Sequence, residues 1–457
     1  MKKIILILLA ATAVLAACNK SESPLKNSTR ISFVASLDAP EGAAPSAAPS
    51  RTELVAGNNV HWISGDQITI FDGETNECYA TTDDGASATF EADIENAGPY
   101  YALYPYDPNA VISGSGNITT TLPAVQRAKA GSFADELNIS IAKTETSTLE
   151  FKNFPSYLKF QVPAANIKRV TIKGADNEPL AGKVQIKMSS SDVPIIQDVK
   201  SGANVVTLLP PPGESVFATD TDYFIALFPG TLANGFWLLF TYSDNTIGVS
   251  FTTKEAAFNR NTILNVHTPT LVQPTDVISF RDPVLTTAYG NSFTVSEAAA
   301  TNSLNSTVLS TATYFDECVF FGLSGGIVGF QNNTNLKQII LPSGITALNK
   351  NSFNGCTNLE AIVLDDALTS IGNSALYGDP KLNSITIPSG VNGISGNAFT
   401  GSGNIDFYWL GSTPPASITG SAFKSSYTFY VPAGSQSAYN TAFTGASITG
   451  TITYYEY

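Results

Sequence analysis

Near its C-terminus the chain repeats one pattern of apolar and polar positions at an interval of 23 residues. Three successive copies begin at Leu336, Leu359 and Leu382, with no insertion between them. Self-similarity at a short fixed period indicates a solenoid, in which each copy is one coil that buries its apolar side chains against neighbouring coils. The apolar residues align in six columns, which are Leu336/Leu359/Leu382, Ile339/Ile362/Ile385, Leu341/Leu364/Ile387, Ile345/Leu368/Val391, Leu348/Ile371/Ile394 and Phe353/Leu376/Phe399. The pattern therefore predicts a rigid stack of coils.

Both ends of this array can be identified. Residues 330–335 stand before Leu336 as residues 353–358 stand before Leu359, so a degenerate copy is expected to begin the stack. At the other end the pattern continues through Ile405, Tyr408 and Leu410, and then come the segment 428–434 and Tyr439. This last segment is expected to close the stack.

The array resembles the BspA-like leucine-rich repeats. The resemblance rests on the closing segment 428–434, on Pro342-Ser343 and Pro388-Ser389 after the strand, and on residues 397–399. It implies a leucine-rich-repeat domain with a C-terminal cap over residues 313–457. The middle copy departs from the pattern at Asp365, Asp366 and Leu376.

One column of the array is expected to face outward. If Ile339 and Leu341 point into the core, strand alternation turns Ile340 out, and the 23-residue period places Val363, Thr386 and Trp409 in the same column. Exposed apolar and aromatic residues are candidate contact anchors, so these four form a candidate ligand-binding strip. The alternative is that Trp409 seals the last coil beneath the closing segment.

The region from Arg51 to about Pro269 is predicted to be all β. Short runs of β-branched and aromatic residues, such as 67–71, 169–172 and 236–240, alternate with turn signals, and sustained helical periodicity is missing. The length fits two β-sandwiches, which we expect at residues 31–147 and 148–270. Residues 271–312 are then a linker and the start of the solenoid cap.

Residues 28–270 resemble a fimbrillin-type pilin from Bacteroidetes. The resemblance lies in the order of several segments, namely Arg51-Thr52, residues 60–62 with Gly65-Asp66, residues 100–106, residues 122–126 and residues 151–153. Each segment alone has a structural explanation, because Trp62 suits a core position and Gly65-Asp66 suits a turn. The resemblance implies a fimbrial or fimbria-like role.

The N-terminus predicts export. Lys2 and Lys3 precede an apolar run that is too short to span a bilayer, and small residues lead to Cys18. This resembles a bacterial lipoprotein signal over residues 1–17, with Cys18 as the lipidated first residue and residues 18–30 as a polar tether. It implies an outer membrane lipoprotein at the cell surface or in a fimbrium. An ordinary signal peptide with an incidental cysteine is the alternative.

Composition narrows the partners. The formal net charge is -14, and it becomes more negative when Lys2 and Lys3 are removed, which argues against nucleic acid and against anionic membrane surfaces. Contact with a membrane is expected through the lipid anchor only. Charged residues make up only 14%, so Ser, Thr, Asn and Gly must supply much of the polar exterior.

No pattern of catalytic or metal-binding residues is recognisable. The two histidines, His61 and His267, lie in different predicted segments, and no second ligand stands at metal-binding spacing. Gly-rich pieces lack the Lys-Ser/Thr of a phosphate loop. We therefore expect no enzyme, no cofactor and no metal, although a pair of carboxylates brought together by folding would leave no local trace.

These expectations combine into one function. The chain is predicted to be a fimbrial-type surface lipoprotein that acts in adhesion or recognition through its leucine-rich-repeat head, as a tip or accessory pilin, with a host or bacterial surface protein or glycan as partner. The alternative is a non-polymerising glycan-binding lipoprotein of a polysaccharide-uptake system.

The pilin resemblance also implies assembly by strand donation between subunits after an Arg-directed protease removes the first strand. Arg51 follows residues 31–35 and a flexible stretch, and it is the matching candidate for processing, with Arg30 as a second one. A plain solvated charge is the other reading of Arg51.

Overall fold

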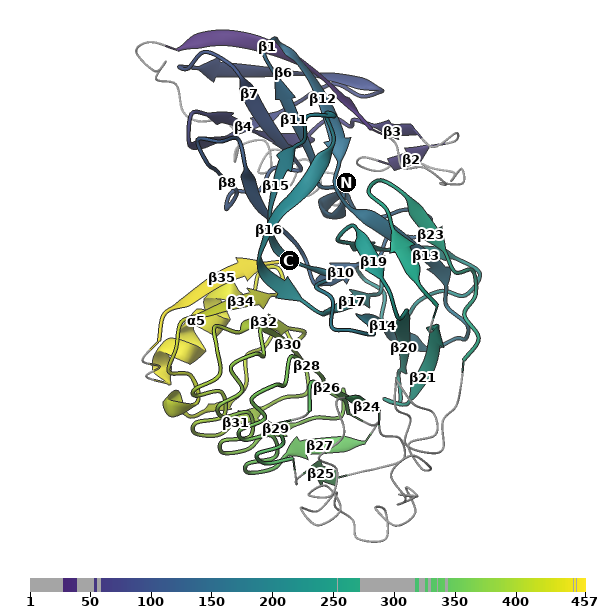
Figure 1. Ribbon diagram of the computed structural model, residues 1–457, viewed down its shortest axis with the longest axis vertical. Coiled ribbons are helices and arrows are strands. Elements are labelled where there is room, and N and C mark those ends of the chain that lie inside the picture. The colour runs from purple at the N-terminus through teal and green to yellow at the C-terminus, as the bar shows by residue number, and fades with distance from the viewer. Residues whose placement is uncertain are drawn as a thin grey trace, which may run out of the picture.

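The computed structural model describes residues 28–38, 53–55, 59–252, 254–271, 317–319, 325–327, 330–334, 336–341, 344–446, 448 and 450–457. Strands dominate these residues, and they form two β domains followed by a solenoid (Figure 1). The predicted mainly β fold with a C-terminal repeat domain is confirmed.

The first domain is built on one sheet with the strand order β5-β4-β7-β11-β12-β1-β6. The edge strands β5 and β6 also contact each other, so the sheet curls around its own core. Its strands are β1 (Thr29–Leu37), β4 (Gln67–Asp72), β5 (Thr75–Ala80), β6 (Ser87–Ile94), β7 (Tyr100–Tyr104), β11 (Ser140–Thr144) and β12 (Thr148–Asn153), and a separate hairpin joins β2 (Glu53–Val55) to β3 (Asn59–His61).

Aromatic rings fill the core of the first domain. Trp62 is fully buried, and its ring lies edge-to-face against Phe90, Tyr104 and Phe151 at centroid distances of 5.2, 5.0 and 5.7 Å. Such geometry is the preferred one for aromatic pairs. The expected structural role of Trp62 as a core aromatic is therefore what the structure shows.

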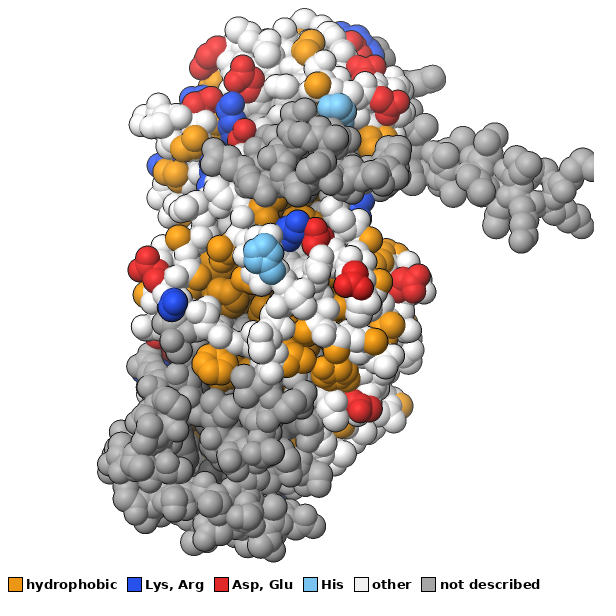
Figure 2. All heavy atoms as spheres, turned by 90° about the vertical axis from the view of Figure 1, so that its right-hand side faces the viewer, with side chains coloured by type: hydrophobic (Ala, Val, Ile, Leu, Met, Phe, Trp, Pro, Cys, Tyr) orange, Lys and Arg blue, Asp and Glu red, His pale blue; other side chains and the backbone are white. Residues whose placement is uncertain are grey.

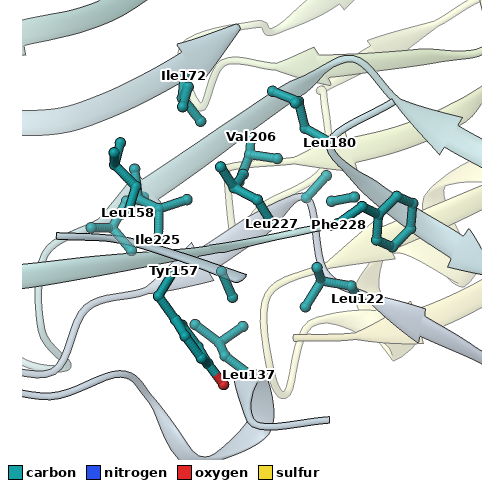
Figure 3. Close-up of a cluster of buried hydrophobic side chains, with 14 of the residues drawn as sticks. Leu122, Leu137, Tyr157, Leu158, Ile172, Leu180, Val206, Ile225, Leu227 and Phe228 are labelled. Carbon is teal, nitrogen blue, oxygen red and sulfur yellow. The ribbon is translucent and has the colours of Figure 1, made fainter. Parts of the chain in front are cut away.

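The second domain combines several sheets around the largest apolar cluster, part of which Figure 3 shows. The sheets have the orders β10-β17-β14-β20-β21, β18-β13-β23, β16-β15-β9-β8 and β19-β22. Their elements are β8 (Val111–Ile112), β9 (Ile118–Leu122), β10 (Val125–Arg127), η1 (Asp135–Leu137), β13 (Ser156–Gln161), β14 (Ile167–Gly174), β15 (Ala181–Met188), β16 (Pro194–Ala203), β17 (Val205–Leu209), β18 (Asp222–Leu227), β19 (Gly230–Leu232), β20 (Phe236–Tyr242), β21 (Ile247–Thr252), β22 (Ala256–Phe258) and β23 (Ile263–Asn265).

The predicted boundary between residues 147 and 148 is not where the sheets divide. Strand β12 pairs with β1 and β11, and its Leu149 and Phe151 belong to the core of the first domain. Conversely, β9 and β10, which lie earlier in the chain, pair with β15 and β17 of the second domain. An apolar pattern identifies a strand but not the sheet that the strand joins, so the prediction placed these segments by sequence order alone.

The solenoid has two walls of parallel strands (Figure 1). We call the wall with β24, β26, β28, β30, β32, β34 and β35 the docked wall, and the wall with β25, β27, β29, β31 and β33 the open wall. The elements are β24 (Glu317–Val319), β25 (Gly325–Ile327), β26 (Gln338–Ile340), β27 (Ile345–Leu348), β28 (Ala361–Val363), β29 (Ser370–Ile371), β30 (Ser384–Ile387), β31 (Gly393–Ile394), β32 (Asp406–Trp409), β33 (Ser417–Ile418), η2 (Gly420–Ala422), β34 (Tyr427–Val431), α5 (Gln436–Gly445) and β35 (Ile452–Glu456).

The coils stack in the register that the repeat predicts. Ile339 pairs with Ile362 on the docked wall, and Ile371 pairs with Ile394 on the open wall. Every residue of the six predicted columns is buried. Cys356 is a free, buried cysteine and packs in the solenoid core.

The helix α5 and the strands β34 and β35 close the C-terminal end of the stack (Figure 1). Tyr439 and Phe443 are the buried residues of α5, and both belong to the solenoid core. No helix within the described residues is long and apolar enough to cross a bilayer.

Candidate binding surface

The predicted ligand-binding strip is not on the free surface. Ile340 and Val363 are 1% and 7% exposed, and both pack into a cluster with Trp237 and Leu239 of strand β20 and Val249 of strand β21. Thr386 is half-buried. The two residues do face out of the solenoid, as predicted, but the second domain covers them. This corrects the expectation of an exposed strip on this wall.

Trp409 does not belong to the outward column. It pairs with Ile387, whose column points inward, and it is 2% exposed. Its ring contacts Phe429, Tyr439 and Phe443 at centroid distances of 5.3, 5.3 and 5.5 Å. The alternative in which Trp409 seals the last coil is therefore correct. The error arose because Thr386 pairs with Tyr408, so this coil is one residue shorter than the period, and a slip of one residue turns a side chain to the other face.

Tyr408 takes the outward position and begins a stack of three tyrosines. The Tyr408 and Tyr430 rings are 4.5 Å apart and nearly parallel, and the Tyr430 and Tyr455 rings are 5.3 Å apart. Tyr408 and Tyr430 belong to the apolar cluster of the second domain. Burial raises the pKa of all three phenols, so they stay neutral and pack as apolar surfaces.

Polar contacts surround this apolar joint. Asp366 pairs with Arg169 at 2.5 Å and with Lys168 at 3.2 Å. The side chain of Gln338 donates to the carbonyl oxygen of Ala175 at 2.9 Å. Two further hydrogen bonds cross the joint, from Asn177 to Glu360 at 3.1 Å and from Ser201 to Asp406 at 2.5 Å.

The charged groups on both sides of the joint are buried. Arg169 and Asp366 have side chains only 5% and 11% exposed, and burial raises the pKa of the Asp406 carboxyl. The sheet of β14 and β20 is thereby covered on both faces, by the core of the second domain and by the solenoid. The docked wall is consequently occupied by the chain itself.

The open wall keeps its outer side chains in solvent. Thr346, Thr369 and Asn392 lie one period apart and are exposed. Backbone hydrogen bonds link the coils here, because the amide of Thr369 donates to the Thr346 carbonyl and that of Asn392 donates to the Thr369 carbonyl, both at 2.8 Å. Neighbouring exposed residues are Lys350, Asn373 and Ser395. This wall therefore presents mainly hydroxyl and amide groups, of which the Thr369 hydroxyl donates to the Thr346 carbonyl at 2.9 Å and the Asn392 side-chain oxygen accepts from the Ala416 amide at 3.0 Å.

Two buried carboxyls lie inside the solenoid and not on this surface. Asp365 and Asp379 are fully buried. Burial raises the pKa of Asp365 to about 6, and backbone hydrogen bonds from Ala367 and Gly344 act in the opposite direction. Burial raises the pKa of Asp379 to about 8, offset in part by the backbone of Cys356. No substrate has access to either group, so they are structural.

Strand β1 is the second candidate surface. It lies between β6 and β12, and Phe33 and Ala35 are fully buried in the core of the first domain. The Trp62 indole donates to the Ala35 carbonyl at 3.1 Å. At the end of the strand, Asp38 pairs with Arg260 of the second domain at 3.2 Å. A groove lined by apolar side chains and two strand edges would remain if β1 were removed.

The two processing candidates differ in what their cleavage would release. Arg30 is exposed within β1 and pairs with Glu91 at 3.3 Å and with Asp93 at 3.7 Å. Cleavage after Arg30 would leave Phe33 and Ala35 attached to the rest of the chain. Arg51 follows the whole strand, but Arg51 and the lipidation candidate Cys18 lie outside the described residues.

Charge and metal-binding groups add little to either surface. On the described part of the face seen in Figure 2, Lys and Arg side chains are dispersed among uncharged ones. A nucleic-acid site would need them clustered. In the part of the chain that the structure describes, no group of three or more His, Cys, Asp or Glu side chains is placed to hold a metal ion.

The sequence contained two signals of the joint that the prediction did not use. Residues 236–240 form an uninterrupted apolar run, which is typical of a strand buried on both faces. The acidic pair Asp365-Asp366 departs from the repeat, since the neighbouring coils have Pro-Ser at these positions. Together these two features mark the two sides of the joint.

A family model matches the repeat region of the chain. Residues 327–449 match, in six copies, the family described as BspA type Leucine rich repeat region. The predicted BspA-type repeats are therefore confirmed. No curated protein matches the chain.

Three solved structures are similar to parts of the chain. A candidate cell adhesion protein from Bacteroides ovatus has 13% identity and a TM-score of 0.33, over 54% of this chain and 95% of that one. A fimbrial protein from the same organism has 12% identity and a TM-score of 0.22, over 52% and 49% of the two chains. A leucine-rich-repeat protein from T. pallidum has 13% identity and a TM-score of 0.18, over 31% and 92%. With TM-scores this low, these likenesses carry no argument about what this chain binds.

Proposed function

We propose that this chain is a cell-surface protein of adhesion or recognition. Its binding head is the solenoid, whose residues 327–449 match BspA-type leucine-rich repeats. The two β domains form the base that carries the head. The observation that carries this proposal is the joint, because a head fixed along one wall presents its other wall in a constant orientation.

The open wall is the binding surface in this proposal. Its Thr346, Thr369 and Asn392 side chains offer hydroxyl and amide groups at the spacing of successive parallel strands, about 4.8 Å. Groups of this kind exchange hydrogen bonds with the hydroxyl and amide groups of a glycan or glycoprotein. A host or bacterial surface glycoprotein or glycan is the partner that fits this surface.

A binding screen with the full-length protein tests this assignment. The protein would be applied to arrays of glycans and of extracellular matrix proteins, and each hit would be repeated with Thr369→Arg. The bulky charge at the centre of the open wall should remove binding, while loss of the hydrogen bond from the Thr369 hydroxyl to the Thr346 carbonyl should lower the free energy of unfolding by only about 0.5–1.5 kcal/mol. Ser437→Arg on α5 is the control, since Ser437 is also exposed but lies on the cap. Retained binding by the Thr369 variant would remove the open wall from the proposal.

Attachment through a lipid at Cys18 is the second element of the proposal. The signal-like N-terminus supports it. Labelling cells with an alkyne fatty acid should mark the wild-type protein and not Cys18→Ser. Protease shaving of intact cells should release the head of the wild-type protein. A protein that resists shaving on intact cells would not be displayed on the surface.

Strand donation is the third element, and it would make the chain a tip or accessory pilin. The position of β1 between two strands supports it, because its removal would leave a groove that an extended strand from another subunit fits. Cleavage at Arg51 would release the whole of β1, whereas cleavage at Arg30 would not.

N-terminal sequencing of surface-extracted protein separates the possibilities. A mature chain that starts just after Arg51, together with polymer ladders on gels of unheated extracts, is the expected result, and both should disappear in Arg51→Ala but not in Arg30→Ala. A monomeric protein that keeps its N-terminus and binds a glycan would instead fit a polysaccharide-uptake lipoprotein.

A further inference from the structure

The solenoid meets the second domain through a surface that repeats itself. The outward column of the docked wall consists of Ile340, Val363 and Thr386, followed by three tyrosines, Tyr408, Tyr430 and Tyr455. A slip of one coil, about 4.8 Å, would replace isoleucine by valine at one end and tyrosine by tyrosine at the other, and it would exchange valine with threonine and threonine with tyrosine between them. Because apolar contact is non-directional, the two ends of the column discriminate poorly between neighbouring registers, and only its middle changes in size and polarity.

The length of the segment that connects the second domain to the solenoid does not select a register either. Residues 272–316 separate the end of the second domain from the first strand of the solenoid. A segment of that length can span a displacement of one strand spacing many times over. The register must therefore be selected by contacts within the joint.

Asp366 forms the ion pairs of the joint and occurs in only one of the three regular coils, as do Gln338 and Glu360, which each form a single hydrogen bond across it. The neighbouring coils have Pro342-Ser343 and Pro388-Ser389 at this place, whereas the middle coil has Asp365-Asp366. The Asp366 carboxylate contacts Arg169 at 2.5 Å and Lys168 at 3.2 Å. Lys168 is also held from its own domain by Asn245 at 2.5 Å, so the cationic site is fixed in position on the second domain.

We propose that Asp366 is the register-determining residue of the joint, and that it selects one among several docked positions of the repeating wall. In the observed register the buried guanidinium of Arg169, with a side chain only 5% exposed, has a carboxylate partner. A slip of one coil in either direction would set a serine there and leave a buried cation without a counter-charge. Breaking a buried pair in this way is strongly unfavourable, whereas the apolar contacts at the two ends of the column change little.

The register of the joint determines where the head holds its open wall. A head docked in one register places its open wall at one position relative to the base. A head that can slip would present the same wall at positions about 4.8 Å apart along the solenoid axis. The replacement of Pro-Ser by Asp365-Asp366 in this coil thus gives the head one defined position relative to the base.

Disulfide trapping reports the register directly. Ser201 of β16 contacts Asp406 of β32, and Asp406 has Ser384 and Thr428 as its partners on the adjacent coils. Ser201→Cys would be combined in turn with Asp406→Cys, Ser384→Cys and Thr428→Cys in the full-length protein. Cross-links formed under mild oxidation would be identified by peptide mass spectrometry.

In the otherwise unchanged protein, only the 201–406 pair should form in high yield. Adding Asp366→Ser, which introduces the residue type of the neighbouring coils, should lower that yield at least about twofold and produce one of the flanking pairs. The reason is that the buried ion pair favours the observed register over its neighbours by a factor on the order of 100, and the substitution removes this preference. Asp93→Ser, which removes an exposed carboxylate on the first domain, is the control and should leave the pattern unchanged.

A charge exchange keeps the test valid if Asp366→Ser disturbs folding. Asp366→Arg alone should abolish the 201–406 pair, and Asp366→Arg with Arg169→Asp should restore it. A sole 201–406 pair of undiminished yield in folded Asp366→Ser would overturn the proposal and assign the register to the remaining contacts, namely the tyrosine stack and the hydrogen bonds of Gln338 and Glu360. Failure of the exchanged pair to restore a single register would overturn it as well.

Discussion

Replacing Asp379 by serine should make the solenoid more stable at neutral pH. Asp379 stands in a column where the preceding coil has Cys356 and the following coil has Ser402. Cys356 donates to the Phe330 carbonyl and Ser402 donates to the Leu376 carbonyl. A serine at position 379 can donate to the Phe353 carbonyl in the same way, so the site accepts a hydroxyl without a new kind of contact.

The magnitude follows from the pKa. Burial raises the pKa of Asp379 from 3.8 to about 8. Between these values the unfolded chain is ionised and the folded chain is protonated, so the folded state binds more protons and stability falls as pH rises. At about 1.4 kcal/mol per pH unit, the largest loss is about 6 kcal/mol, reached above pH 8. The difference in free energy of unfolding between Asp379→Ser and the wild type should therefore increase by about 3 kcal/mol, in favour of the variant, when the pH is raised from 5 to 7.5.

Guanidinium unfolding and hydrogen exchange at several pH values would measure this difference. Because the chain has several domains, exchange of coil peptides is needed to read the solenoid separately. Cys356→Ser is the matched control, since it introduces the same side chain in the same column without removing a carboxyl. Parallel pH profiles for wild type and Asp379→Ser would refute the reasoning, because the wild-type slope could then not come from Asp379.

Three further substitutions test the packing. Trp409→Ser should lower the free energy of unfolding by about 3–5 kcal/mol, since it empties the seal beneath α5; calorimetry showing an unchanged melting temperature would return Trp409 to a surface role. Val363→Asp places an unpaired charge against Trp237 and should detach the head, so small-angle scattering should show a larger radius of gyration, whereas an unaltered radius would mean that the joint does not depend on this contact. Phe33→Ala should cost about 3–5 kcal/mol by leaving a cavity beside Tyr100, and denaturant unfolding indistinguishable from wild type would mean that β1 contributes little to the first domain.

Spacing along the sequence was sufficient to predict the interior of the solenoid. An identical period places equivalent side chains over one another, so the six columns could be written down from the sequence, and all their members are buried. The strands β1, β4, β14 and β20 were likewise predicted near their observed places, because alternation and apolar runs are local properties. The period failed at the last coil, where the loss of one residue turned Trp409 inward and Tyr408 outward.

The partner of each surface was decided only by the tertiary structure. The sequence showed that Ile340 and Val363 face out of their coil, but the hydrophobic effect carries no information about which surface will cover them. Strand β12 joined the first domain and β10 joined the second because sheet pairing depends on contacts far apart in the chain. For the same reason the sequence predicted an exposed strip on a wall that the second domain covers. A periodic pattern specifies which side chains are buried together, and only the folded chain specifies what they contact.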